Sequence, residues 1–226
     1  MVLILTNDDG VDAPGIEALF KAVNGNQAII VAPQRQHSGC GHQVTTHQPI
    51  NIQRRSDSCY AIAGTPADCV RIALTQICLD TKYVISGINA GGNMGVDAYM
   101  SGTVAAAREA AIHGIGGIAV SQYRRAKVDY NWDLAARWTS QLLTQLWAYP
   151  LKPGSFWNVN LPSLSPEAPD PEVVFCQPCT KPLALNYRLE GDNYYYVGEY
   201  SQRDRIPGSD VDVCFSGKIA VTQLQV

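Results

Sequence analysis

The fold is decided by one stretch of the sequence, Val2-Leu3-Ile4-Leu5-Thr6-Asn7-Asp8-Asp9-Gly10. A short apolar run, long enough for one buried strand, ends there at two adjacent carboxylates and a glycine. Pro14-Gly15 then opens an amphipathic segment, residues 16–23, so the order predicts a strand, an acidic loop and a helix. In open α/β sheets, ligands bind at the carboxyl ends of the strands, where Asp8 and Asp9 fall.

The pair of aspartates has two interpretations. Two neighbouring carboxylates repel each other unless a positive charge lies between them, and a divalent cation supplies that charge. Alternatively, one carboxylate caps the helix and the other is solvated, which is the more common situation for an isolated pair. The two residues alone do not choose between a metal site and an ordinary helix start.

The composition describes a folded protein with a real core. At 226 residues, the chain suffices for one large domain, or for one domain with an appendage. With 46% hydrophobic and 16% charged residues, disorder is not expected, and the net charge of −3 argues against binding a nucleic-acid duplex through its phosphates. No run approaches the roughly 18 apolar residues of a membrane span. Met1 leads directly into the first strand, which leaves no room for a signal peptide, so we expect a cytoplasmic protein.

The cysteines and histidines do not form an evident metal site. Seven scattered cysteines without framework spacing favour reduced thiols. Cys176 and Cys179 have the spacing of half a zinc site, but the sequence has no second pair to complete it. His37, His42 and His47 recur every five residues, a spacing that fits neither a helix face nor a strand face. We therefore expect neither a structural zinc nor a histidine cluster.

Short β-branched runs alternate with helical segments along the first part of the chain. Such alternation is typical of a mostly parallel sheet with helices on both faces, and so of an α/β fold. The predicted strands are residues 2–5, 28–32, 83–86, 117–121 and 157–161. Helix starts are also visible: Thr65 is a candidate N-cap, with Pro66 in the first turn and Asp68 three residues after the cap. A later helix is predicted over 131–149, and an antiparallel ribbon over 43–52.

The character of the chain changes after Pro162. Residues 163–171 are rich in proline, serine and acidic residues, which is typical of a linker. Tyrosines then alternate as in a strand, at Tyr187, Tyr194, Tyr195, Tyr196 and Tyr200, and they predict a β-hairpin arm. The arm either forms a subunit contact or folds back on its own domain. We divide the chain into a catalytic core, 1–162, and a segment with the arm and the last strand, 163–226.

Three loops follow predicted strands and are rich in small and polar residues instead of large side chains. They are residues 7–10, 37–42 and 86–95. Glycine lets the backbone approach a ligand closely and offers N–H groups to an anion. Ser101-Gly102-Thr103 opens the helical segment 104–113, and hydroxyls at a helix N-terminus suit phosphate. Each signal alone is weak, since a glycine-rich loop is usually a turn and Thr103 can be an ordinary N-cap.

The combination of signals is more specific than any one of them. A carboxylate pair and an anion-binding helix start on one sheet edge are what a metal-dependent phosphate enzyme needs. The available ligands are carboxylate, hydroxyl and amide oxygens, which favour Mg²⁺ or Mn²⁺ over zinc. From the residues alone, the sequence predicts an α/β protein that handles phosphate.

Ordered motifs along most of the chain resemble the SurE family of metal-dependent nucleotidases. These motifs are residues 5–16, 31–33, 38–39, 64–70, 86–91, 99–109, 158–162 and 209–222. The resemblance implies a Rossmann-like core, a C-terminal arm exchanged between the subunits of a homodimer or homotetramer, and hydrolysis of nucleoside monophosphates with Mg²⁺ or Mn²⁺. By the same resemblance, the metal ligands fall on Asp8, Asp9, Ser38 and Asn89.

Three positions depart from the family pattern. Gln34 and His37 stand where the family commonly has Asp and Arg, and Gly92 stands where it has Pro. Because Gln34 and His37 share a loop with Ser38, these two departures concern substrate preference more than metal binding. The glycine at position 92 only loosens a loop.

The resemblance leads to a mechanistic hypothesis. Water, activated by the metal, attacks the phosphorus of a nucleoside monophosphate in line, while the phosphate oxygens are held by Asn93, Ser101, Gly102 and Thr103. Asp8 can instead be a nucleophile that forms an aspartyl-phosphate. His42 is a candidate proton donor to the leaving oxygen, or a residue that packs its loop. Two other functions stay open: a sensor that binds nucleotides without hydrolysing them, and, ranked last, a nucleotide-sugar transferase.

Overall fold

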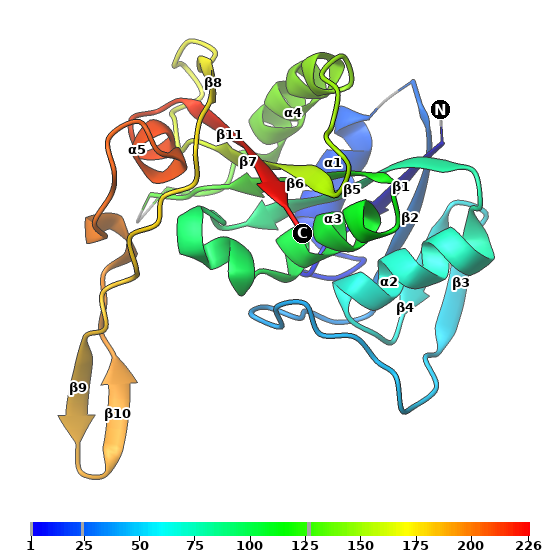
Figure 1. The fold of residues 1–226 in the computed structure, drawn as a ribbon, viewed down its shortest axis with the longest axis horizontal. Coiled ribbons are helices and arrows are strands. Elements are labelled where there is room, and N and C mark those ends of the chain that lie inside the picture. Colours follow the sequence, from blue (N-terminus) through cyan, green and yellow to red (C-terminus); the bar gives the residue numbers. More distant parts are fainter. Residues whose placement is uncertain (1, 24, 126–127) are drawn as a thin grey trace.

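The computed structural model describes residues 2–23, 25–125 and 128–226, and over these ranges nine strands form one central sheet (Figure 1). Met1, on which the expectation about a signal peptide rests, lies outside them. The sheet order is β3-β4-β2-β1-β5-β6-β7-β11-β8. The strands are β1 (Val2–Thr6), β2 (Gln27–Pro33), β3 (Ile52–Ser56), β4 (Cys59–Ile62), β5 (Thr81–Ala90), β6 (Gly116–Gln122), β7 (Ser155–Leu161), β8 (Val173–Phe175) and β11 (Ile219–Gln225).

The centre of the sheet is parallel, as the alternation of strands and helices predicts. β1 pairs in parallel with both β2 and β5, and β6 pairs in parallel with β5 and β7. All five strands predicted from the sequence are confirmed, each extended by one or more residues. The carboxyl ends of β1, β2, β5 and β6 therefore meet at one edge of the sheet, which positions the loops that follow them.

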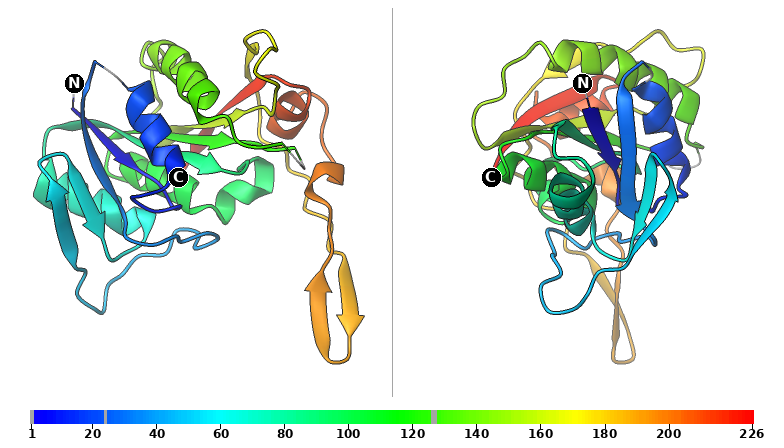
Figure 2. Two further views of the ribbon diagram at one scale, coloured as in Figure 1. Left: turned by 180° about the vertical axis from the view of Figure 1, so that it is seen from behind. Right: turned by 90° about the vertical axis from the view of Figure 1, so that its right-hand side faces the viewer.

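Helices cover both faces of the sheet, so the fold is a three-layer α/β structure (Figure 2). On one face, α1 (Pro14–Ala22) and α4 (Trp132–Leu146) bury Leu19, Leu142 and their neighbours against the sheet. On the other face, α2 (Pro66–Ile72) and α3 (Gly102–Ile112) close a second core around Val70 and Ala106. The alanine-rich sequence of α3 lets this helix lie close to the strands.

The helix starts follow from capping side chains. Asp68 N–H donates to Thr65 Oγ1 at 3.2 Å, and Thr65 N–H donates to Asp68 Oδ2 at 3.0 Å, so the predicted capping box of α2 is confirmed. Asn131 caps α4, which ends at Leu146 and is shorter than predicted. Ser101, not Thr103, caps α3: its Oγ accepts from Val104 N–H at 3.1 Å. The hydroxyl of Thr103 is therefore left for another partner.

The predicted antiparallel ribbon over 43–52 is wrong. Residues 43–51 are a loop, Ile52 begins β3, and the antiparallel pair lies further along, between β3 and β4. The loop satisfies its polar groups through a side chain on another element: Thr45 donates its N–H and its hydroxyl to Asp68 at 2.8 and 2.7 Å. Alternation in the sequence does not reveal such a partner, because Asp68 belongs to a helix far along the chain.

The segment after residue 162 divides between the sheet and a projecting arm. β8 and β11 extend the sheet beyond β7, and α5 (Asp210–Phe215) packs beside β11. The predicted hairpin is confirmed as β9 (Tyr187–Glu190) and β10 (Asn193–Tyr196), which extend away from the body of the molecule (Figure 1). Within the described ranges, no helix combines the length and apolar character needed to cross a bilayer.

Candidate functional site

The loop after β1 is locked into a single shape by Asn7. Its Nδ2 donates to the carbonyl of Gly10 at 2.8 Å, and Gly10 N–H donates back to Asn7 Oδ1 at 3.1 Å. Gly10 has a φ of +108°, a conformation that favours glycine. This turn fixes Asp8 and Asp9 at the end of the strand. Asp8 is 5% exposed, whereas Asp9 is more accessible.

Three loops meet at these carboxylates, as the sequence predicts. Gln36 Nε2 donates to Ser38 Oγ at 2.7 Å and lies 3.5 Å from Asp9 Oδ1. Ala90 N–H donates to Asp9 Oδ2 at 3.1 Å, and it directly follows Asn89. A pocket of about 320 Å³ opens between the loops. Its lining residues are Asp8, Asp9, Gln36, Ser38, Gly39, Asn89, Ala90, Asn93, Asp97, Met100 and Ser101.

The environment of Asp8 disfavours its negative charge. Burial raises the pKa of Asp8, and the negative charge of Asp9 raises it further. The Thr103 hydroxyl, which donates to Asp8 Oδ1, lowers it in part, and the pKa that results is about 6. A nearby cation would stabilise the ionised carboxylate of Asp8, because a positive charge offsets both the loss of solvation on burial and the repulsion from Asp9. A perturbed carboxylate that lines a pocket is also a common property of functional sites.

The side chains around the pocket fit a hard divalent cation. None of its described lining residues is a lysine or an arginine, so Asp8 and Asp9 face the pocket without a basic counterpart there. Over the described parts of the chain, no group of three or more His, Cys, Asp and Glu residues is arranged to hold a metal. Neutral oxygens that could complete a ligand set lie beside Asp8 and Asp9: the hydroxyl of Ser38 and the side chain of Asn89, whose Nδ2 donates to Gly91 O at 2.7 Å and leaves Oδ1 as an acceptor. Such a set suits Mg²⁺ or Mn²⁺.

The four residues expected at phosphate divide into two pairs. Asn93 and Ser101 line the pocket. Gly102 and Thr103 instead lie behind Asp8: Thr103 is fully buried with its hydroxyl on Asp8 Oδ1, and a Cβ at Gly102 would come within 2.9 Å of Asp8 Cβ. The start of α3 thus supports a carboxylate as well as the pocket wall.

His42 does not line the pocket. Its Nε2 bonds Glu109 Oε2 at 2.6 Å, and Glu109 is fully buried and also bonds Arg71 and His113. This geometry favours the packing role for His42 over that of proton donor. Gln34 and His37 also lie outside the lining: Gln34 Nε2 reaches Ala61 O at 3.4 Å, and His37 N–H donates to Asp8 O at 2.7 Å.

Two features of the site carry no signal in the sequence. Gln36 joins Ser38 to Asp9, but it stands in an irregular loop without a motif of its own. Asp97 lines the pocket, and its Oδ2 accepts a hydrogen bond from Arg203 Nη1 at 2.6 Å, across more than a hundred positions of sequence. Tyr200 Oη donates to the same Asp97 oxygen, also at 2.6 Å. The base of the arm is therefore bonded to the pocket wall.

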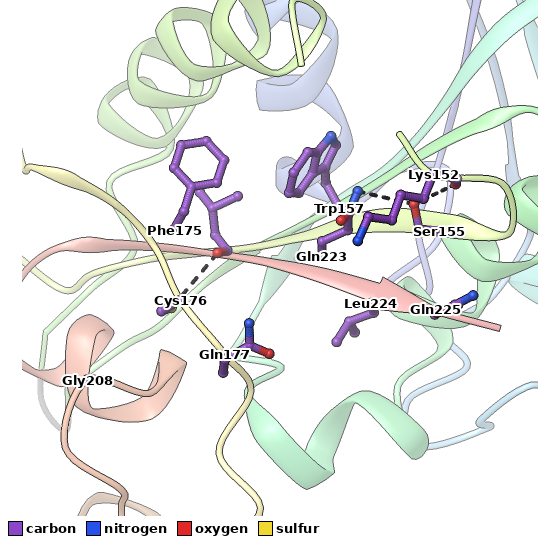
Figure 3. Close-up of a pocket in the computed structure, with 11 residues that line it drawn as sticks. Lys152, Ser155, Trp157, Phe175, Cys176, Gln177, Gly208, Gln223, Leu224 and Gln225 are labelled. Carbon is purple, nitrogen blue, oxygen red and sulfur yellow. Dashed lines mark hydrogen bonds between the residues drawn. The ribbon is translucent and has the colours of Figure 1, made fainter. Parts of the chain in front are cut away.

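A larger cavity lies elsewhere and lacks the chemistry of the first. It measures about 650 Å³ and lies along β7, β8 and β11 (Figure 3). Its side chains are apolar or amides, apart from Lys152, Ser155 and Cys176, and Cys176 Sγ points to Val221 O. No carboxylate or imidazole is among its described lining residues. It offers no set of groups for acid–base or metal chemistry.

Known proteins resemble this chain over its whole length. The family model described as "Survival protein SurE" matches residues 3–183. The protein alr3139 of Nostoc sp. is 68% identical over 226 residues, which cover 100% of both chains. A Heliobacterium modesticaldum protein named "5'-nucleotidase SurE" is 38% identical over 99% of this chain and 86% of its own. The crystal structure of the SurE protein of Aquifex aeolicus superimposes with a TM-score of 0.86 at 29% identity, covering 100% of this chain and 93% of that one.

Proposed function

Because the chain belongs to the SurE family, we propose that it is a 5′-nucleotidase, which hydrolyses nucleoside monophosphates to nucleoside and phosphate. Relatives at 38% and 36% identity that align with nearly the whole chain carry the name 5′-nucleotidase SurE. The family's opening motif, 5–16, contains the loop that holds Asp8 and Asp9 at the pocket here.

The observation that carries this proposal is a pocket whose described lining holds three aspartates and no basic residue. Asp97 is paired with Arg203, whereas no ion pair among the described residues involves Asp8 or Asp9. A phosphate monoester carries negative charge, so it would be repelled by Asp8 and Asp9 unless a cation lay between them. Asp8, Asp9, Ser38 and Asn89 would hold Mg²⁺ or Mn²⁺. When bound, such an ion neutralises phosphoryl oxygens and makes water a stronger nucleophile.

The protein's own groups hold the substrate and the carboxylates in place. Asn93 and Ser101 line the wall that a phosphate would face. Asn93 is fixed from behind, since its N–H donates to Asn160 Oδ1 at 2.8 Å and its Nδ2 to Ser121 Oγ at 2.9 Å. Thr103 orients Asp8, and Gly102 allows α3 to approach it. His42 holds the loop of Ser38 through Glu109.

We also propose that the arm makes subunit contacts in a homodimer or homotetramer. Its strands expose Tyr187, Leu189, Tyr194 and Tyr196, each at least half exposed, on a hairpin that projects from the body (Figure 1). Aromatic side chains are enriched at the cores of interfaces. Light scattering on the double variant Leu189→Ser/Tyr194→Ser should give a smaller mass than that of the native protein.

We propose that the protein is cytoplasmic. All seven cysteines are free thiols, which supports a reducing compartment.

A nucleotide panel tests the proposed activity. Phosphate release from AMP, GMP, CMP and UMP is measured with Mg²⁺, with Mn²⁺ and with excess EDTA. We expect release that requires a metal, and a loss of at least about a hundredfold in Asp8→Asn with the melting temperature retained. Nucleotide binding without release would favour the sensor instead, and consumption of diphosphate-sugar donors would favour the transferase. Rapid-quench detection of a phosphorylated Asp8 would replace the attack of water by a covalent route.

A further inference from the structure

Two side chains of the connection between β6 and α4, with the first residue of α4, form a stacked ladder that the proposed phosphate site does not use. The rings of Tyr130 and Trp132 stack with centroids 5.0 Å apart and an interplanar angle of 21°. The guanidinium carbon of Arg124 lies 5.2 Å from the centroid of the Tyr130 ring. Arg124 is exposed and forms no ion pair with a carboxylate of the described residues. The ladder thus ends in a planar cation that faces solvent.

The ladder stands beside the loops that form the candidate metal site. Ala90 and Gln122 are paired across β5 and β6, and Gly91 N–H donates to Gln122 O at 3.1 Å. Arg124 follows two residues later, at the same edge of the sheet as Asn89. At the other end of the ladder, a Cβ at Gly15 would lie 3.3 Å from the Trp132 ring, so Trp132 packs on the start of α1, just beyond the Asp8-Asp9 loop.

Electrostatics agree with this placement. Burial raises the pKa of Tyr130, Arg124 lowers it, and the carboxylate of Asp9 raises it further, so Tyr130 lies within the field of the candidate metal site. A groove of about 570 Å³ lies beside Tyr130 and Trp132, between the start of α4 and the loop after β7, and Asp129 and Asp133 also line it. Tyr130, Trp132, Leu164 and Pro166 are among the residues that line it. Phosphate pocket and aromatic groove are separate hollows on one edge of the sheet.

We propose that Arg124, Tyr130 and Trp132 form the subsite for the base of the nucleotide. The base stacks on the solvent-facing guanidinium of Arg124, and Tyr130, which lies between Arg124 and Trp132, supports that guanidinium from behind. This inference rests on the proposed nucleotidase function. A nucleoside monophosphate is charged at one end and carries a flat aromatic base at the other, and such bases bind by stacking on aromatic rings and on guanidinium planes. Stacking requires no particular hydrogen-bond pattern, so the subsite accepts every base and favours purines, which have the larger ring.

The test compares substrates that differ only in the base. Ribose 5-phosphate has the sugar and phosphate of AMP without the adenine, so the ratio of kcat/KM for AMP to that for ribose 5-phosphate measures recognition of the base. Tyr130→Ala removes the ring that supports the Arg124 guanidinium, so we expect it to lower this ratio about 5- to 100-fold, the range that stacking of one base supports, chiefly through KM. Tyr130→Phe keeps the ring and should keep the ratio within about twofold. Tyr149→Ala removes a half-exposed tyrosine that contacts Phe175 at the far end of α4, and it is the matched control with an unchanged ratio.

Several outcomes would overturn the subsite. An unchanged ratio in Tyr130→Ala, an equal loss for both substrates, or a native enzyme that turns over ribose 5-phosphate as fast as AMP would each do so. If Tyr130→Ala does not fold, Arg124→Ala at the exposed end of the ladder should lower the ratio at least about threefold. Calorimetry with adenosine, which has no phosphate, keeps the two proposals apart: adenosine binding that Tyr130→Ala weakens supports the base subsite even if no nucleotide is hydrolysed, and absence of binding counts against it.

Discussion

Replacing Arg203 by methionine should destabilise the protein strongly, because it leaves a buried carboxylate without its cation. Arg203 Nη1 lies 2.6 Å from Asp97 Oδ2, and the two side chains are 1% and 10% exposed. Tyr200 Oη donates to the same oxygen. Breaking a buried pair by removing one partner typically costs about 3–5 kcal/mol. The remaining hydrogen bond from Tyr200 offsets part of that cost, so we expect about 3 kcal/mol in Arg203→Met, or roughly 6–12 °C in melting temperature for a chain of this size.

The double variant Asp97→Asn/Arg203→Met should behave differently. Within the described structure, Asp97 Oδ1 and two guanidinium nitrogens of Arg203 have no hydrogen-bond partner. The native pair is therefore incompletely satisfied, and it recovers little of what burying two charges costs. Removing both charges should bring the free energy of unfolding back to within about 1 kcal/mol of the native value. The coupling between Asp97 and Arg203 then accounts for most of the free energy of unfolding that Arg203→Met loses.

Urea unfolding followed by tryptophan fluorescence measures all four members of the cycle, at one protein concentration because subunit contacts would shift the midpoints. Nucleotidase activity is read in parallel, since the carbonyl of Asp97 accepts from Met100 N–H and Ser101 N–H at the pocket wall. A loss below about 1 kcal/mol in Arg203→Met, or a double variant no more stable than that single one, would refute the reasoning about an uncompensated charge.

Three further predictions concern the support of the site. Gly102→Ala places a Cβ 2.9 Å from Asp8 Cβ and from Cys40 Sγ; kcat/KM should fall about a hundredfold with a small change in melting temperature, and an active variant would show that α3 need not approach Asp8 so closely. Thr103→Val removes the hydroxyl that donates to Asp8 and should weaken Mn²⁺ binding by calorimetry about tenfold, whereas Thr103→Ser should not. Burial alone would raise the pKa of Glu109, but hydrogen bonds from His42, Arg71 and His113 outweigh it and lower the pKa to about 2. Because the folded pKa lies below the unfolded one, this stability is present above the ordinary pKa of 4.5 and is lost as pH falls toward 2. Glu109→Gln should therefore cost about 2 kcal/mol at pH 7, a value discounted because Arg71 and His113 are nearly half exposed, and the cost should shrink below pH 4.5; a cost independent of pH would contradict this.

Sequence patterns predict the features that depend on neighbouring residues. The parallel strands, the capping box at Thr65 and the arm hairpin each follow from a short segment, and each is found in the structure. The meeting of Asp8 and Asn89 at one edge also follows, because parallel strands align their carboxyl ends. What the sequence does not predict depends on partners far along the chain. Thr45 binds Asp68 in place of a neighbouring strand, and Asp97 binds Arg203.

Contacts between residues far apart in the sequence also explain how the site can keep a buried carboxylate that is unfavourable by itself. Asp8 is buried beside a second carboxylate, and residues that break a local rule in this way are expected where function requires them. The surrounding structure holds it there through contacts from separate elements: the Asn7 turn, the hydroxyl of Thr103 and the N–H of His37 on the Asp8 carbonyl. None of these contacts neutralises the charge. The fold thus fixes the position of the carboxylate and leaves its charge to be compensated by whatever binds in the pocket, so that binding of a cation and of phosphate should each strengthen the other.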